Sequence, residues 1–229
     1  MANILKKAAS NLIDKMSARA RVLDIRAWHS NSMYEIDLHL PAIDLSKWKA
    51  IQRLKCSVGE FEWRDYTPAK WDVEKRTCTL YIEAAHNGVG SRWVKNLQKD
   101  DVVSFGAAYA AKLPTSTGKI LCLGDGSALG HFLALKQLTN RNEYPLEAAV
   151  FLHEEYNTLD NFYAENPEFE FQIGTNSMKV LEQCINTKSL KEYSSICIAG
   201  YIPMVTTLLK KIKNISGVQA KIYAVGFWS

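Results

Sequence analysis

The chain has 229 residues, 47% of them hydrophobic and 23% charged, which is enough apolar sequence for one large domain or two small ones. Its net charge of +4 is spread over scattered lysines, which argues against a nucleic-acid-binding protein, and no apolar run is long enough to cross a membrane. The five cysteines form no CxxC pair, which argues against a zinc site or a disulfide framework and favours a reducing cytoplasm.

Residues 1–20 are predicted to form an amphipathic helix, because Ile4, Leu5, Leu12 and Ile13 recur at helical spacing. We expect this helix to dock on the body of the protein. The alternative is a helix that lies on a membrane surface.

Residues 21–114 are predicted to form an antiparallel β domain. Six short segments rich in β-branched or aromatic residues are separated by turn residues, and several alternate apolar with polar positions. These segments are residues 21–29, 32–40, 52–58, 61–67, 78–85 and 101–108. Such a series of strands is typical of a barrel or a sandwich.

Residues 115–229 change to a pattern in which strands alternate with helices. Strands are predicted at 119–124, 147–153, 169–174, 194–200 and 221–227, and helices at 128–139, 159–166, 177–185 and 203–215. This alternation predicts a parallel sheet covered on both faces, which binds ligands at the carboxyl ends of its strands. The boundary between the two domains lies in the small, polar stretch at 110–119.

The first predicted strand of the second domain ends in "LGDGSALG", residues 123–130. Gly124 and Gly126 permit a tight turn, and the helix start behind them offers N–H groups that suit a phosphate. The spacing differs from the dinucleotide fingerprint, and the same kind of turn occurs in α/β proteins that bind no nucleotide.

The segment "HNGVGSRW", residues 86–93, is a second candidate phosphate site. Gly88, Gly90 and Ser91 can present N–H groups and a hydroxyl at the start of a helix. The alternative is that Ser91 only caps a short helix while the glycines form the turn. His86 on its own is more typical of a structural histidine, because no nucleophile lies near it in the sequence.

The segment "RDYT", residues 64–67, alternates like a strand and is followed by Pro68. Arg64 and Tyr66 share a face, on which arginine can pair with phosphate and tyrosine can stack on a planar ring. The Thr67 hydroxyl can donate to a ring nitrogen. The alternative is an ordinary exposed strand.

The order of these motifs resembles the siderophore-interacting protein family, the FAD-binding ferric-siderophore reductases of the ferredoxin-reductase superfamily. That family's pattern is Arg-x-Tyr-Thr-x-Arg, then His-Gly-x-Gly-Pro-Ala-Ser-x-Trp, a Gly-Asp-Glu-Thr-Ala-like turn and an end near Gly-Tyr-Trp. Here "RDYT", "HNGVGSRW", "GDGSA" and the terminal "GFW" follow in the same order, and the resemblance extends from about Val22 to Trp228. It implies a six-stranded antiparallel FAD-binding β-barrel over 21–114 and a parallel-sheet α/β domain for NAD(P)H over 115–229.

The resemblance also implies roles for individual residues. Tyr66 would lie against the isoalloxazine, Thr67 near its reactive edge and Arg64 at the FAD phosphate or ribityl chain. The loop for the diphosphate and adenosine would comprise His86, Gly88, Gly90, Ser91 and Trp93. The NAD(P)H site would be bordered by Gly124, Asp125, Gly126 and Ser127, with Gly200 at a later strand end. The terminal Phe227-Trp228 either caps the core or brings an aromatic residue, Trp228, to the mouth of a cofactor site between the domains.

The sequence departs from the family pattern at the second arginine. Ala69 stands at that position, and Lys70 beside it is the expected cationic replacement. Lysine offers a point charge where arginine offers a fork to a phosphate. Val89 and Gly90 replace the proline and alanine of the phosphate loop.

These features predict a cytoplasmic FAD-dependent NAD(P)H oxidoreductase that reduces a ferric siderophore or another iron chelate. Because the flavin supplies the chemistry, we assign no catalytic residue and no metal site. One alternative is a flavin reductase or electron-transfer component that serves a protein partner. Another is a binding module that keeps the fold but has lost tight FAD binding, which the Ala69 departure would allow.

Overall fold

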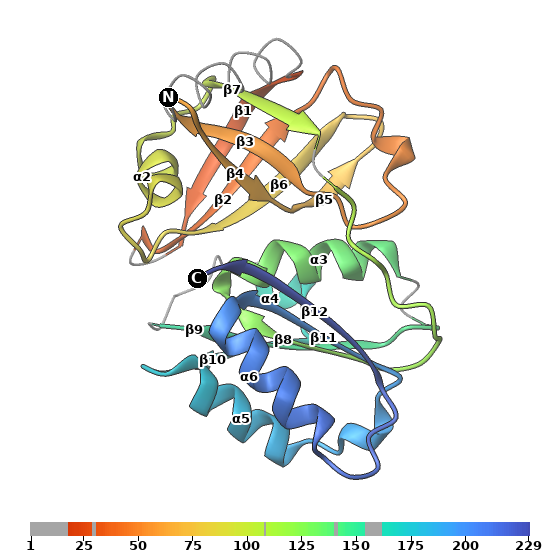
Figure 1. Cartoon of the computed structure of the whole chain (residues 1–229). Coiled ribbons are helices and arrows are strands. Elements are labelled where there is room, and N and C mark those ends of the chain that lie inside the picture. Colours follow the sequence, from red (N-terminus) through yellow and green to blue (C-terminus); the bar gives the residue numbers. More distant parts are fainter. Residues whose placement is uncertain (1–17, 29–30, 108, 140–141, 154–161) are drawn as a thin grey trace, which may run out of the picture. The chain divides into compact units, whose positions relative to one another are not determined.

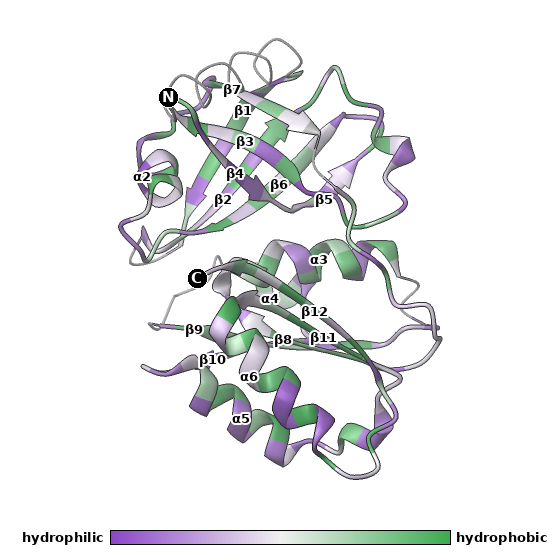
Figure 2. Ribbon diagram, viewed as in Figure 1, coloured by the Kyte–Doolittle hydropathy of each residue, from purple (hydrophilic) through white to green (hydrophobic). Residues whose placement is uncertain are grey.

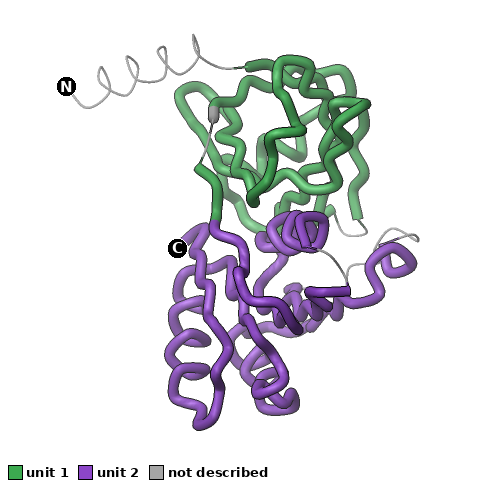
Figure 3. The backbone as a smooth tube through the Cα atoms, turned by 90° about the vertical axis from the view of Figure 1, so that its right-hand side faces the viewer, with its two compact units in different colours: residues 1–111 green, residues 112–229 purple. Residues whose placement is uncertain are grey.

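The computed structural model describes residues 18–28, 31–107, 109–139, 142–153 and 162–229. The chain forms two compact units, residues 1–111 and 112–229 (Figures 1 and 3). The change of unit falls within the polar stretch at 110–119, where the sequence places the domain boundary. Most of the helix predicted for residues 1–20 lies outside the described residues. Residues 18–20 are not helical, because they belong to a strand that pairs with residues 103–105.

In its described residues, the first unit is an antiparallel β domain with one short α-helix (Figure 1). Along the chain it comprises β1 (Ala18–Ala27), β2 (Met33–His39), η2 (Leu45–Lys47), β3 (Leu54–Gly59), β4 (Glu62–Tyr66), β5 (Pro68–Asp72), β6 (Thr77–Glu83), α2 (Val89–Asn96) and β7 (Val102–Ala107). The sheet order is β4-β3-β7-β1-β2-β6-β5. The sheet curls around a core that includes Val22, Ile36, Leu80 and Phe105. Along each strand, the positions that point into this core are apolar, as expected from the alternation of side chains.

The sheet has seven strands rather than the six predicted. The extra strand is β5, which begins at Pro68, where the prediction ended a strand. A proline lacks the N–H of a central ladder position but is tolerated as the first residue of a strand. Thr67 is therefore the only residue between β4 and β5, which are the two end strands of the sheet.

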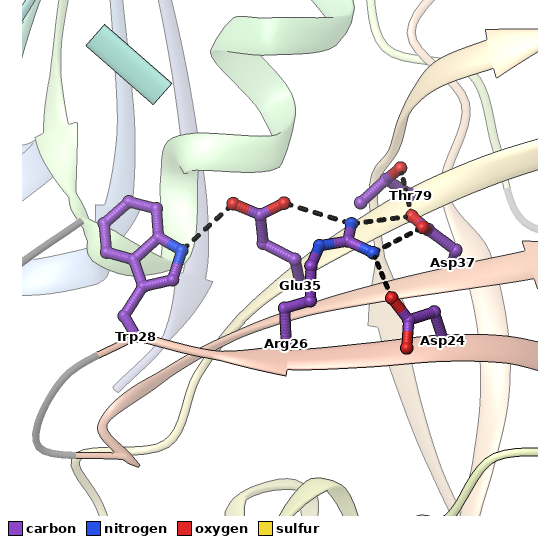
Figure 4. A network of polar contacts seen from close by, with 6 residues as sticks. All are labelled: Asp24, Arg26, Trp28, Glu35, Asp37 and Thr79. Carbon is purple, nitrogen blue, oxygen red and sulfur yellow. Dashed lines mark hydrogen bonds and ion pairs between the residues drawn. The ribbon is translucent and has the colours of Figure 1, made fainter. Parts of the chain in front are cut away.

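A polar network lies on β1, β2 and β6 and is centred on Arg26 (Figure 4). The guanidinium donates to both oxygens of Asp37, at 2.6 and 3.1 Å, and to Glu35 at 3.2 Å. It also donates to Asp24 at 2.9 Å. Glu35 is only 5% exposed, and its second oxygen accepts from the Trp28 indole at 3.0 Å. One guanidinium thus neutralises carboxylates that burial would otherwise make costly.

The second unit is an α/β domain built on one parallel sheet. It comprises β8 (Ile120–Asp125), η3 (Gly126–Ala128), α3 (Leu129–Leu138), β9 (Leu146–Leu152), α4 (Phe162–Glu165), β10 (Phe169–Ile173), α5 (Ser177–Thr187), η4 (Leu190–Glu192), β11 (Ser195–Tyr201), α6 (Ile202–Lys213) and β12 (Lys221–Trp228). The sheet order is β10-β9-β8-β11-β12, and every pairing is parallel. The predicted two-part fold class is thereby confirmed.

Helices cover both faces of this sheet (Figures 1 and 2). Leu121 and Leu123 of β8 pack into one core with α5 and α6. Ile120 and Cys122 alternate with them along β8 and are also fully buried, so they lie on the opposite face of the strand. In Figure 1, α3 lies on the side of the sheet opposite to α5 and α6. A continuous apolar run is the pattern expected of a strand buried on both faces. Figure 2 shows hydrophobic residues along the central strands and a mixture of hydrophobic and hydrophilic residues along α5 and α6.

The strand order reverses between β8 and β11, which lie side by side although β9 and β10 intervene in sequence. Chain crossovers run in opposite directions from such a point, so the carboxyl ends of the two strands border a crevice that suits ligands. We refer to this place as the switch point.

All five cysteines of the chain are buried and free. Among the helices described, none has the length and apolar character needed to cross a membrane.

Acid is expected to weaken the second unit through Glu147, which lies near the amino end of the sheet. Burial opposes its ionisation, but hydrogen bonds from Lys119, Tyr193 and Lys188 outweigh burial and lower the pKa of Glu147 to about 2 from an ordinary 4.5. Because the folded-state pKa is the lower one, this stabilisation is complete above about pH 4.5 and is lost as the pH falls towards 2.

The test of this prediction compares urea denaturation of the wild type with that of Glu147→Gln at pH 7 and pH 3. The carboxylate is 33% exposed, so solvent screening limits its pH-dependent contribution to about 1–2 kcal/mol. The wild type should lose that much more stability than the variant between the two pH values. Equal losses would contradict the assignment.

Candidate functional site

In the first unit, Arg64 and Tyr66 of β4 lie against the first turn of α2. A Cβ atom placed on Gly90 would collide with the Tyr66 hydroxyl and would lie 3.7 Å from Arg64 Cγ. The Tyr66 ring also stacks on the Trp93 ring, with 5.7 Å between centroids and 20° between planes. Burial raises the pKa of Tyr66, so its phenol is neutral at physiological pH. The structure thus brings together four of the residues proposed from sequence.

The N-terminus of α2 has no side-chain cap. Its N-cap is Gly88, and the first helical hydrogen bond runs from Arg92 N–H to the Gly88 carbonyl at 3.1 Å. The N–H groups of the first three helical residues, Val89 to Ser91, therefore precede the helical ladder and form the positive end of the helix dipole. A Cβ on Gly88 would meet nothing within 4 Å. This turn has the chemistry of an anion site.

Ser91 is not the cap of this helix, since α2 begins before it. Its side chain is buried, with 6% of the residue exposed, so its contribution to a site at this turn would be its backbone N–H. The preceding turn is held by Arg92, whose guanidinium donates to the Asn87 carbonyl at 2.5 Å. His86 lies in the same turn, with Nε2 3.9 Å from a carboxylate oxygen of the buried Glu83.

Ala69 and Lys70 of β5 lie in different environments. Ala69 is fully buried and pairs with Thr79, so a side chain at this position points into the protein. Lys70 is exposed, has a φ of 49° and carries its ammonium 5.9 Å from the centre of the Tyr81 ring. Lys70 follows the buried Ala69 and so faces outward, in the stretch between Ala69 and Asp72 where the pairing of β5 with β6 is irregular. Lys70 is the cation that this stretch presents.

In the second unit, the residues predicted to border a dinucleotide gather at the switch point. Asp125 ends β8, and its Oδ1 accepts from the Ser127 N–H at 3.0 Å and from the Ser127 hydroxyl at 2.5 Å. Its Oδ2 accepts from the Tyr201 N–H at 2.7 Å. The carboxylate of one strand end therefore binds the backbone of both turns that border the crevice.

Two glycines allow the strand ends to approach so closely. Gly200 has a φ of +123°, which favours glycine, and a Cβ there would lie 2.5 Å from Asp125 Oδ1. A Cβ on Gly124 would lie 2.5 Å from the Ala199 carbonyl oxygen. Both positions need glycine so that the Asp125 carboxylate can reach across from β8 to β11.

The C-terminal Trp228 belongs to the same cluster. Its indole N–H donates to the Ser127 hydroxyl at 3.2 Å, and its ring lies 4.4 Å from the Tyr201 ring, centroid to centroid. Tyr201 was missed in the sequence analysis. The available signal was an aromatic residue directly after the "IAG" that ends a predicted strand.

Solved structures match this chain along most of its length. A siderophore-interacting protein from Acinetobacter baumannii has a TM-score of 0.70, covers 93% of this chain and 90% of its own, and is 11% identical. One from Aeromonas hydrophila has a TM-score of 0.70 over 94% and 92%, at 13% identity. The ferredoxin reductase of a carbazole 1,9a-dioxygenase has a TM-score of 0.67 over 91% and 67%, at 19% identity.

The chain has the fold of the siderophore-interacting proteins and ferredoxin reductases. The resemblance inferred from the motifs is confirmed at the level of this ferredoxin-reductase-like fold. No protein-family model and no curated protein sequence matches the chain. Within the ferredoxin-reductase-like fold, one predicted residue set lies in the β unit and the other at the switch point of the α/β unit.

Proposed function

We propose that this protein is an FAD-dependent NAD(P)H oxidoreductase that reduces a ferric siderophore. The observation that carries the proposal is the β-unit site, where Arg64 and Tyr66 lie against the uncapped N-terminus of α2. A flat aromatic side chain, a guanidinium and a row of N–H groups are the features that a flavin nucleotide requires.

The residues of this site fit FAD by their chemistry. Gly88, the N-cap of α2, carries no side chain, and a Cβ there would meet nothing within 4 Å, so a diphosphate could approach the N–H groups of the first α2 turn from that side. Arg64 would pair with the diphosphate or ribityl chain, and Tyr66 would lie against the ring system. Thr67 and Lys70 follow directly along the chain, where a hydroxyl and an ammonium would contact polar atoms of the cofactor.

A groove of about 550 Å³ beside α2 offers a place for the adenosine end. Val89 and Trp93 line it, and both belong to the first turns of the helix that would hold the diphosphate. Asn96 and Asp101 add an amide and a carboxylate that can pair with an adenine edge. An aromatic wall with a few polar groups is typical of nucleoside sites.

Bound FAD would accept a hydride from NAD(P)H and deliver electrons singly to ferric iron. The chain's part in that reaction is to hold and orient both nucleotides. Reduction of the iron weakens its hold in the chelate, because siderophore oxygens bind ferric iron as a hard acid. We propose that NAD(P)H binds at the switch-point residues of the α/β unit.

The test begins with the visible spectrum of the purified protein after incubation with FAD and gel filtration. We expect flavin absorbance that bleaches when NADH or NADPH is added without oxygen. Arg64→Ala should weaken FAD binding tenfold or more, since hydrogen bonds to charged groups contribute about 1.5–3 kcal/mol. Arg21→Ala, on an exposed part of the same unit, is the matched control. A protein that keeps no flavin and bleaches none would overturn the proposal and favour a binding module.

A second candidate is an electron-transfer component for a protein partner, because the fold is also that of the carbazole-dioxygenase ferredoxin reductase. The two functions separate in one assay. Turnover of NAD(P)H with ferric chelates supports the siderophore reductase, whereas turnover only with a redox protein supports the second candidate.

A further inference from the structure

The Asp125 carboxylate at the switch point binds groups of the chain itself. It is 3% exposed, and both of its oxygens accept hydrogen bonds from the chain itself. The donors include the backbone N–H groups of Ser127 and Tyr201, which belong to the turns at the ends of β8 and β11. These are the groups that would bind a phosphate at an open switch point. Here they already hold a carboxylate, whose charge would also repel a phosphate.

The Ser127 hydroxyl connects this carboxylate to the C-terminal ring. A serine hydroxyl has one proton to donate, and Ser127 donates it to Asp125 Oδ1 at 2.5 Å. Its lone pairs remain as acceptors, and the Trp228 indole N–H, which can only donate, uses one of them at 3.2 Å. The direction of both hydrogen bonds is fixed by this chemistry, from Trp228 to Ser127 and from Ser127 to Asp125.

The Trp228 ring is held from a second direction by Tyr201. The two rings lie 4.4 Å apart, centroid to centroid, at 34°. Tyr201 is itself fixed, because its N–H donates to Asp125. One carboxylate therefore controls both aromatic residues: Trp228 through the Ser127 hydroxyl and Tyr201 through its backbone.

We propose that Asp125 and Ser127 are positioning residues that hold Trp228 and Tyr201 as an aromatic surface at the switch point. This edge of the sheet then receives the planar ring of a nicotinamide dinucleotide rather than its diphosphate. The identity of the ligand rests on the proposed function, whereas the positioning of Trp228 does not. Asp125, assigned from the sequence to the border of the NAD(P)H site, acts on the ligand through the aromatic residues it positions.

The experiment uses the full chain labelled with 5-fluorotryptophan and observed by ¹⁹F NMR without cofactors. The chain has six tryptophans, and Trp228→Phe assigns the resonance of Trp228. Ser127→Ala should shift or broaden that resonance and leave the five others in place, and Ser127→Thr, which keeps a hydroxyl, should restore it. A Trp228 resonance that is the same in Ser127→Ala and in the wild type would overturn the proposal.

Ser46→Ala is the matched control. Ser46 makes the same pair of bonds to Asp44, through its N–H at 3.2 Å and its hydroxyl at 2.6 Å, in the first unit. The variant removes an equivalent local hydrogen bond and should leave the Trp228 resonance unchanged. A shift equal to that of Ser127→Ala would mean that the resonance reports general stability, and would overturn the positioning role.

Binding of NADH and NADPH to the same variants tests the role towards the ligand. Ser127→Ala should weaken the preferred dinucleotide about 2- to 10-fold, the effect of one neutral hydrogen bond, and Ser127→Thr should recover it. Unchanged affinity with a displaced Trp228 resonance would overturn the positioning role towards the ligand. If neither the wild type nor any variant binds NADH or NADPH, the proposed function is wrong. The NMR result still decides whether Asp125 and Ser127 position Trp228.

Discussion

Arg26→Met is expected to destabilise the β unit by about 2–4 kcal/mol, between the values for exposed and fully buried ion pairs. Methionine keeps most of the side-chain volume but removes the only guanidinium in contact with Asp24, Glu35 and Asp37 among the described residues. Burial opposes the ionisation of Asp37, but hydrogen bonds from Arg26 and Thr79 outweigh it and lower the pKa of Asp37. Without Arg26, the buried Glu35 carboxylate keeps the hydrogen bond from the Trp28 indole but loses its contact with a cation.

The measurement is urea denaturation followed by tryptophan fluorescence, because five of the six tryptophans (Trp28, Trp48, Trp63, Trp71 and Trp93) lie in this unit. Arg21→Met is the control on the same strand, since its pair with Asp100 is 3.8 Å long and exposed. It should change the free energy of unfolding by less than about 1 kcal/mol. Adding Glu35→Gln to Arg26→Met should recover part of the loss. Equal effects of the two arginine variants would refute the account.

Lowering the pH gives an independent check on the same network. The pKa of Asp37 is lowered in the folded wild type, so its stabilisation is present above the ordinary pKa of 3.8 and is lost below it. In Arg26→Met that stabilisation is already gone. The difference in stability between wild type and variant should therefore shrink as the pH falls below 4.

Gly90→Ala is expected to weaken both the β unit and the FAD binding that we propose for it. The new methyl would collide with the Tyr66 hydroxyl, and the Tyr66 ring is restrained by its stacking on Trp93. Overpacking of this kind costs about 1–3 kcal/mol, even though alanine favours a helix more than glycine. Displacement of Tyr66 should also lower the affinity for FAD about tenfold or more, measured by quenching of flavin fluorescence on binding.

Two variants isolate the cause of this effect. Gly88→Ala adds a methyl two residues earlier with nothing within 4 Å, so the protein without cofactor should lose only the preference for glycine over alanine at an N-cap, up to about 1 kcal/mol. Tyr66→Phe removes the colliding oxygen and keeps the ring. Gly90→Ala combined with Tyr66→Phe should therefore be more stable than Gly90→Ala combined with an intact Tyr66. A double variant no more stable would show that the collision is not the cause.

The sequence predicted most of the elements, because their apolar patterns are strong and local. The continuous apolar runs at Ile120–Asp125 and Ser195–Tyr201 are strands buried on both faces, and their flanking helices follow at the expected places. The error was β5. Pro68 was interpreted as the end of a strand, whereas only its register with Leu80 shows that it begins the next one.

The residues of the candidate site could be predicted from the sequence, but the groups that they contact could not. Arg64, Tyr66 and the glycines of the α2 turn were selected by residue type and order. The role of Asp125 depends on the N–H of Tyr201, which lies 76 residues away in sequence. Likewise, the local sequence could not indicate that Ala69 is on the buried face and Lys70 on the exposed one, because the pairing of β5 with β6 decides which face of β5 is buried.

The position of β7 in the first sheet has a consequence for synthesis on the ribosome. Among the strands that the structure describes, β7 comes last in the unit, yet it lies between β3 and β1 and alone joins the β4-β3 hairpin to the β1-β2-β6-β5 group. Until Val102–Ala107 has left the exit tunnel, the nascent unit consists of two sheet fragments with unpaired edges at β1 and β3. Such edges favour pairing with other chains. Chaperones that hold nascent chains should therefore engage this chain before β7 emerges and release it soon afterwards.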